Sequence, residues 1–179
     1  MQRSLTMAAH TERHKSSCIT GAFVYYHYYV WGSVLSAKSV AVRLLSRREH
    51  SAFEIRDKLL QRDFEEDEIE QVIEELQRGG WLSDERFAEA YVRMRQQKGF
   101  GPIRIAIELN ERGVNESIVD ACLHAGDENW RQTLLKQYRK KYRDREVEDY
   151  NDKAKRIRFM QYRGFSLDMI YKEITFNNK

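Results

Sequence analysis

The stretch GFGPIRIAIELNERGV, residues 99–114, holds Pro102, the only proline in a chain of 179 residues. Proline fits the first turn of a helix, because the N–H that it lacks has no partner there and its ring already fixes a helical φ. The apolar residues that follow recur at helical spacing, and Gly113 can take the left-handed conformation that ends many helices. The stretch therefore predicts a short amphipathic helix over residues 102–112.

The end of this helix belongs to a pattern that occurs three times, at a spacing of about 50 residues. An apolar residue is followed three positions later by an Arg, then by a turn residue and an apolar anchor. The copies are Leu59, Arg62, Asp63 and Phe64; Leu109, Arg112, Gly113 and Val114; and Met160, Arg163, Gly164 and Phe165. Such self-similarity indicates a repeat architecture, in which each unit buries its apolar face against a neighbour.

Capping residues and apolar spacing predict three helices in each copy. Ser51 and Glu54 form a capping-box pattern, Ser83 precedes a second helix start, and Asp127 a third. Other expected helices cover residues 38–47, 115–123, 151–163 and 166–176. We therefore predict an all-α fold, an elongated array of three tandem three-helix repeats, divided into repeat 1 (37–80), repeat 2 (81–126) and repeat 3 (127–179).

The charge of the chain is unevenly distributed. The formal net charge is +3, but residues 49–75 hold 11 acids and 3 bases, whereas residues 136–163 hold 11 bases and 5 acids. Repeat 1 is therefore acidic and repeat 3 basic. A basic face can attract phosphate groups or an acidic protein surface, and the alternative is an ordinary solvated helix face.

Several classes of function find no support in the sequence. Cys18 and Cys122 are far apart and belong to no CxxC pair, so we expect neither a disulfide framework nor a metal site, and a cytoplasmic protein. No nucleophile motif or phosphate-cradling glycine loop is present, so we expect no enzyme activity and no cofactor. Residues 1–36 resemble neither a clean signal peptide nor a membrane span, and we expect a disordered extension or one translated from an upstream start; the alternative is an ordered arm that packs on the repeats.

Aromatic residues at helical spacing predict packing in the helical cores. This set comprises Trp81, Phe87, Tyr91, Trp130, Tyr138 and Tyr142. The alternative is stacking on nucleobases, chiefly by Tyr138, Tyr142 and Tyr150, which lie among basic residues.

Three motifs resemble the bacterial RecX family, small regulators of the RecA recombinase. They are Gly80-Trp81-Leu82-Ser83-Asp84-Glu85-Arg86-Phe87-Ala88, Gly99-Phe100-Gly101-Pro102 and Tyr162-Arg163-Gly164-Phe165, within a match over about residues 38–176. The resemblance implies three-helix repeats that lie in the groove of the RecA filament on single-stranded DNA and inhibit RecA. Asp63 departs from the glycine of the other two copies, and residues 1–36 have no counterpart in the family pattern.

Basic residues are the candidates for contact with the filament. In repeat 3 they are Arg139, Lys140, Lys141, Arg143, Lys155, Arg156 and Arg158, and in repeat 2 Arg93, Arg95, Lys98 and Arg104. We expect a monomer that binds the RecA filament, with weak direct DNA binding and no membrane contact. The alternative function is a helical DNA-binding module that acts without recombinase, although the second and third helices of repeat 1 are acidic.

Overall fold

The structure, a computed structural model, describes residues 36–124, 127–143 and 145–174. The chain divides into the units Met1–Val34 and Leu35–Lys179, and all the described residues lie in the second. The expected extension therefore lies outside the described residues, apart from Ser36. No helix within the described ranges is long and apolar enough to cross a membrane.

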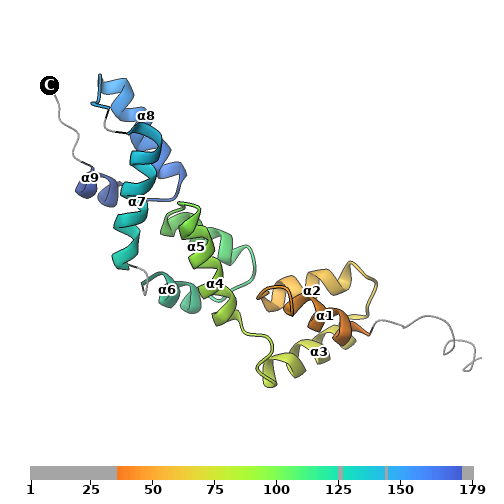
Figure 1. Cartoon of the computed structure of the whole chain (residues 1–179). Helices are drawn as coiled ribbons and strands as arrows, with labels where there is room; N and C mark the ends of the chain where they lie inside the picture. Colours follow the sequence, from red (N-terminus) through yellow and green to blue (C-terminus); the bar gives the residue numbers. More distant parts are fainter. Residues whose placement is uncertain (1–35, 125–126, 144, 175–179) are drawn as a thin grey trace, which may run out of the picture. The chain divides into compact units, whose positions relative to one another are not determined.

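The described ranges contain nine α-helices and no strand, which confirms the predicted all-α fold of three-helix repeats (Figure 1). The helices are α1 (Ala37–Leu45), α2 (Ala52–Leu60), α3 (Glu66–Arg78), α4 (Asp84–Gln97), α5 (Pro102–Asn110), α6 (Glu116–His124), α7 (Asp127–Tyr142), α8 (Tyr150–Tyr162) and α9 (Leu167–Glu173).

The capping signals in the sequence act as expected at several helix starts. The Ser51 side chain accepts a hydrogen bond from the Glu54 N–H, and Ser83 does the same for Arg86. Ser36 caps α1 by accepting from the Ser39 N–H. These oxygens satisfy N–H groups that have no partner within the helix. The cap expected from Asp127 involves a side chain outside the described set.

The three turns that follow the repeated Leu-x-x-Arg or Met-x-x-Arg pattern share one backbone conformation. Asp63, Gly113 and Gly164 have positive φ angles of 60°, 71° and 93°. In the middle copy the Val114 N–H donates to the Leu109 carbonyl, and the first and third copies form the equivalent bond. The prediction of a left-handed residue here is confirmed.

Some helices are shorter than the sequence pattern suggests. The helix expected over 102–112 ends at Asn110, because the Arg112 N–H donates to the Leu109 carbonyl three residues back and tightens the last turn. The first helix ends at Leu45 rather than at residue 47, and the Arg47 N–H makes the same kind of bond to Leu44. After α5 the tightened turn leads into the left-handed corner at Gly113.

Three hydrophobic clusters form the cores. Ile55 and Ile69 belong to the first, Phe87 and Ile105 to the second, and Leu134 to the third. Leu82 packs in the first cluster and Trp130 in the second, although the sequence division places each in the following repeat. Consecutive repeats therefore share side chains at their boundaries.

One aromatic prediction is wrong. Trp81, expected in the core, is 65% exposed, because the turn after α3 places its neighbour Leu82 inward instead. Phe87 and Trp130, by contrast, are buried as expected.

Consecutive repeats meet at equivalent places. The Ser51 hydroxyl at the start of α2 donates to the Arg112 carbonyl at 2.8 Å, in the corner of repeat 2. Fifty residues later the Gly101 N–H at the start of α5 donates to the Arg163 carbonyl at 2.7 Å, in the corner of repeat 3. The start of the second helix in one repeat thus contacts the left-handed corner of the next.

This contact explains which corners require glycine. A Cβ atom on Gly113 would lie 2.7 Å from the Phe53 Cβ, and one on Gly164 would lie 2.4 Å from the Arg104 Cβ. Asp63 shares the left-handed φ but lies in the first repeat, where no earlier described repeat packs against the corner. Asp tolerates that φ better than most residues, so the first corner can carry a side chain.

Gly113→Val should therefore destabilise the protein more than Asp63→Gly. The valine meets both a left-handed backbone and the Phe53 side chain, and we expect a loss of about 1 to 2 kcal/mol from the backbone alone. Glycine at position 63 relieves the backbone instead and changes stability little. Urea denaturation of both variants measures the difference; equal free energies of unfolding would contradict the role of Gly113.

Candidate functional site

The basic residues of repeat 3 gather at the end of α7 and on α8. Arg139, Lys140 and Lys141 lie in the last turn of α7 and Arg143 directly follows it; Tyr142 in this turn contacts Phe159 of α8. We define the third-repeat basic surface by the exposed cations of this region: Arg139, Lys140, Lys141, Arg143, Lys155 and Arg158. None of the six forms an ion pair with an acid in the described ranges.

Aromatic contacts fix the end of α7 on α8. The Lys141 ammonium lies 3.5 Å from the centroid of the Phe159 ring, a cation–π contact. Tyr142 meets the same ring edge to face at 5.9 Å and packs on Tyr138 at 5.2 Å. Burial raises the pKa of Tyr142 above its usual value. These tyrosines are committed to packing rather than to nucleobase stacking.

Arg156 does not belong to the exposed surface, and its prediction as a filament contact is corrected on this point. Its side chain is 2% exposed and pairs with Asp152 at 2.7 Å. It also donates to the Tyr138 hydroxyl and to the carbonyls of Arg145 and Glu146, at 2.8 to 2.9 Å. Its Nε also donates to the Asp152 carboxylate at 2.9 Å, so all three nitrogens of the guanidinium have partners. Arg156 therefore anchors the segment between α7 and α8.

The charge pair at this anchor is held in its ionised form. The hydrogen bond from Arg156 lowers the pKa of Asp152, and the nearby Arg145 adds to the effect. Desolvation alone would lower the pKa of Arg156, but hydrogen bonds to Asp152 and Tyr138 outweigh it, and the net shift is upward. Sequence spacing alone placed Arg156 beside Lys155 and could not reveal that it points inward.

The candidate residues of repeat 2 do not form one cationic surface. Arg93 is paired with Glu89 and faces α6, whereas Arg95 and Arg104 both pair with Glu108. The side chain of Arg95 is only 15% exposed. Lys98 is exposed and forms no ion pair with a described acid. Most of these basic side chains therefore form ion pairs with acids of the same repeat.

The Phe100 ring joins repeats 2 and 3 through three guanidinium groups. Arg95 lies 3.7 Å from the ring centroid, Arg163 5.0 Å and Arg104 5.4 Å. Arg163 also donates to the Lys98 carbonyl at 3.1 Å. The repeated Arg of the corner pattern is thus a junction residue, a role that sequence spacing alone does not reveal.

Glu108 is the acidic centre of this junction. Burial would raise its pKa, but hydrogen bonds from Arg95, Arg104 and Tyr91 outweigh burial and lower it. One carboxylate thus pairs with two neighbouring guanidinium groups and reduces the repulsion between them. The residues around Phe100 hold the repeats together, whereas the six cations of the third-repeat basic surface form no ion pair with a described acid.

Comparison with known proteins agrees with the repeated geometry. Models of the first, second and third three-helix domains of RecX match residues 37–76, 83–123 and 127–174. Regulatory protein RecX of Legionella pneumophila (strain Corby) is 39% identical over 132 residues, covering 74% of this chain and 88% of that protein. Regulatory protein RecX of Vibrio parahaemolyticus is 35% identical over 145 residues, covering 81% and 94%.

A solved structure supports the same assignment. The crystal structure of RecX from Lactobacillus salivarius superposes with a TM-score of 0.66 at 25% sequence identity, covering 76% of this chain and 90% of that one. These relatives are named regulatory proteins and have a helical-repeat fold. The three domain matches and the identities to full-length relatives show that the chain belongs to the RecX family.

Proposed function

We propose that this protein binds the RecA filament on single-stranded DNA and inhibits the recombinase, using the third-repeat basic surface. The observation that carries the proposal is that six exposed cations of one repeat lack acidic partners in the described ranges. Most other arginines in the described part of the chain pair with an acid of the same chain, as Arg56 does with Glu70 at 2.6 Å. Unneutralised cations can act at a distance on a polyanionic partner.

Exposed lysines and arginines contribute mainly through long-range attraction. They raise the rate of association with an oppositely charged partner, and salt weakens this effect. A repeat array can follow a long filament with many modest contacts, so no single charge has to supply the affinity. The proposal therefore concerns the surface as a group.

A second function, direct binding to DNA without recombinase, is favoured by one observation. Tyr150 is 83% exposed and Tyr162 is 70% exposed, and both lie on α8 with Lys155 and Arg158. Exposed aromatic rings near cations can stack on the bases of single strands. Such binding would need no RecA and would weaken steeply with salt.

The test of the filament proposal is a charge-reversed variant of the full chain. Arg139, Lys140, Lys155 and Arg158 change to Glu, while Lys141 is kept because it packs on Phe159. We expect inhibition of the DNA-dependent ATP hydrolysis of RecA to require about tenfold more variant, or more, and to depend less on salt.

The control exchanges two exposed lysines of the same repeat that lie outside the surface, Lys136 and Lys172, for Glu. This control should inhibit like the parent protein. Circular dichroism checks that both variants remain helical. A folded fourfold variant that inhibits as well as the parent would exclude the third-repeat basic surface.

A further inference from the structure

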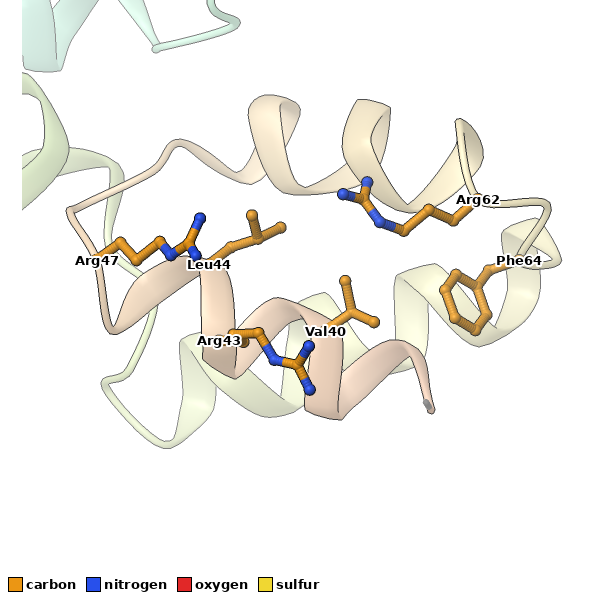
Figure 2. Close-up of a pocket in the computed structure, with 6 residues that line it drawn as sticks. All are labelled: Val40, Arg43, Leu44, Arg47, Arg62 and Phe64. Carbon is orange, nitrogen blue, oxygen red and sulfur yellow. The ribbon is translucent and has the colours of Figure 1, made fainter. Parts of the chain in front are cut away.

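The first repeat contains a pocket that the proposed function does not use. It lies between α1 and the corner that joins α2 to α3, with a volume of about 470 Å³ (Figure 2). Its lining combines two chemistries: three apolar side chains, Val40, Leu44 and Phe64, and three arginines, Arg43, Arg47 and Arg62. Arginine is the residue best suited to bidentate recognition of carboxylates.

The three arginines have no acidic partner among the described residues, although the repeat is rich in acids. Their neighbours differ: Arg48 pairs with Glu54 at 2.8 Å, and Arg86 with Glu49 at 3.1 Å. Among the described residues, the Arg62 side chain donates to the Lys58 carbonyl of α2 and to no carboxylate. The pocket therefore has three guanidinium groups that pair with no described carboxylate. They surround one apolar floor, and this arrangement suits the binding of an anion.

The close-up shows how the groups converge. Arg47 extends from the end of α1 and Arg62 from the corner after α2, and their guanidinium groups point toward each other across Leu44 (Figure 2). Phe64 flanks the same space, and Val40 is 7% exposed at its base. A ligand in this space would meet apolar side chains below and cations at its rim.

Comparison of the three repeats explains why Arg62 is available. The equivalent Arg112 approaches Glu54 of the preceding repeat at 3.7 Å, and the equivalent Arg163 donates to the Lys98 carbonyl of the preceding repeat. Arg62 occupies the same position in the first repeat, where no described repeat precedes it. Asp63 in place of glycine also shows that this corner is not built for the close packing of another repeat.

We propose that this pocket is a docking site for an acidic segment of a partner protein that carries an apolar side chain between carboxylates. The carboxylates pair with Arg43, Arg47 and Arg62, and the apolar side chain lies against Val40, Leu44 and Phe64. This site is separate from the third-repeat basic surface, and it does not depend on RecA binding there.

The surroundings favour a protein segment over a nucleic acid. Acidic residues border the pocket directly, with Asp63 before Phe64 and Glu65 and Glu66 after it, all exposed. A nucleic acid carries a continuous row of phosphates, which these carboxylates would repel. A peptide can place two or three carboxylates at the arginines and remain neutral elsewhere. The apolar floor also suits a side chain such as Leu or Phe, whereas a phosphate gains nothing from it.

The experiment uses the full chain and a labelled synthetic peptide in which Asp and Glu flank a Leu-Phe pair. Fluorescence anisotropy compares the parent with a variant carrying Arg43→Gln, Arg47→Gln and Arg62→Gln. The matched control, Arg78→Gln, Lys136→Gln and Lys172→Gln, removes the same number of exposed charges outside the pocket and outside the third-repeat basic surface. We expect the pocket variant to bind the peptide about tenfold more weakly, and the control within about twofold of the parent.

Two further measurements define the occupant. A peptide with Ser in place of Leu and Phe should bind more weakly than the original, and amide signals of α1 and of residues 62–64 should shift in NMR spectra of the parent with peptide. Absence of peptide binding, equal binding by the pocket variant, or shifts only elsewhere would overturn the proposal. An oligothymidylate that binds the parent more tightly than the peptide does, and is lost in the pocket variant, would make the pocket a nucleic-acid site instead.

Discussion

Gly164→Ala is expected to destabilise the protein by about 2 to 4 kcal/mol, far more than the same change at Gly80. Both glycines have positive φ angles, 93° and 71°. A Cβ atom on Gly80 meets no atom within 4 Å, so it adds only the backbone penalty of about 1 kcal/mol. A Cβ atom on Gly164 would also lie 2.6 Å from the Arg104 backbone N, which cannot move aside like the end of a side chain.

Comparison of Gly80→Ala with Gly164→Ala separates two effects that occur together at Gly164: the left-handed backbone and the close contact with Arg104. Urea denaturation of Gly80→Ala gives the cost of the left-handed backbone, and the excess in Gly164→Ala gives the cost of separating repeats 2 and 3. Hydrogen exchange should show the excess as lost protection of the Gly101 and Ile103 amides, which donate to the Arg163 and Gly164 carbonyls. If the two variants unfold with equal free energies, the described contact between the repeats is not part of the stable fold.

Arg156→Met is the second large effect, with an expected loss of about 2 to 3 kcal/mol. Methionine fills similar space but leaves the Tyr138 hydroxyl and the carbonyls of Arg145 and Glu146 without their donor. These three acceptors supply the loss, because each gives up a charge-assisted hydrogen bond in a partly buried setting. Asp152 contributes little, since its carboxylate can be hydrated.

The matched control is Arg158→Met, two residues further along α8. Arg158 is exposed, and within the described residues its side chain donates to the Ala154 carbonyl of the same helix. Its replacement should change the free energy of unfolding by about 0.5 kcal/mol or less. Thermal denaturation of both variants tests the assignment, and a larger loss for Arg158→Met would show that the two arginines have been given the wrong roles.

The fold was largely predictable because local physics and the repeat pattern agree. Pro102 marks the start of α5, Ser51 and Ser83 cap the helices expected of them, and the corner residues take the left-handed conformation. Each of these features depends on a few neighbouring residues. Trp81 was missed because the turn after α3 decides which of two adjacent apolar residues faces the core, and the sequence offers both.

The candidate site was less predictable, because the sequence shows which residues are charged but not which of them form ion pairs. Lys155, Arg156 and Arg158 are all basic residues of the same helix, and the sequence does not distinguish them. In the structure only Arg156 lies under the segment that follows α7. Glu108 and Arg163 also escaped notice as junction residues, since their partners lie 13 and 65 residues away. The sequence showed that the Arg of the corner pattern is repeated. Only the contact between repeats in the structure shows that this Arg joins one repeat to the next.

The central claim, that the protein acts on the RecA filament rather than on DNA alone, is tested most directly by one binding measurement. A labelled full chain is titrated with single-stranded DNA, bare or coated with RecA, at several salt concentrations. We predict tighter binding to the coated DNA throughout, with the gain reduced when Arg139, Lys140, Lys155 and Arg158 are changed to Glu. Equal binding to bare and coated DNA, weakening steeply with salt, would contradict the claim and identify a DNA-binding protein that needs no recombinase.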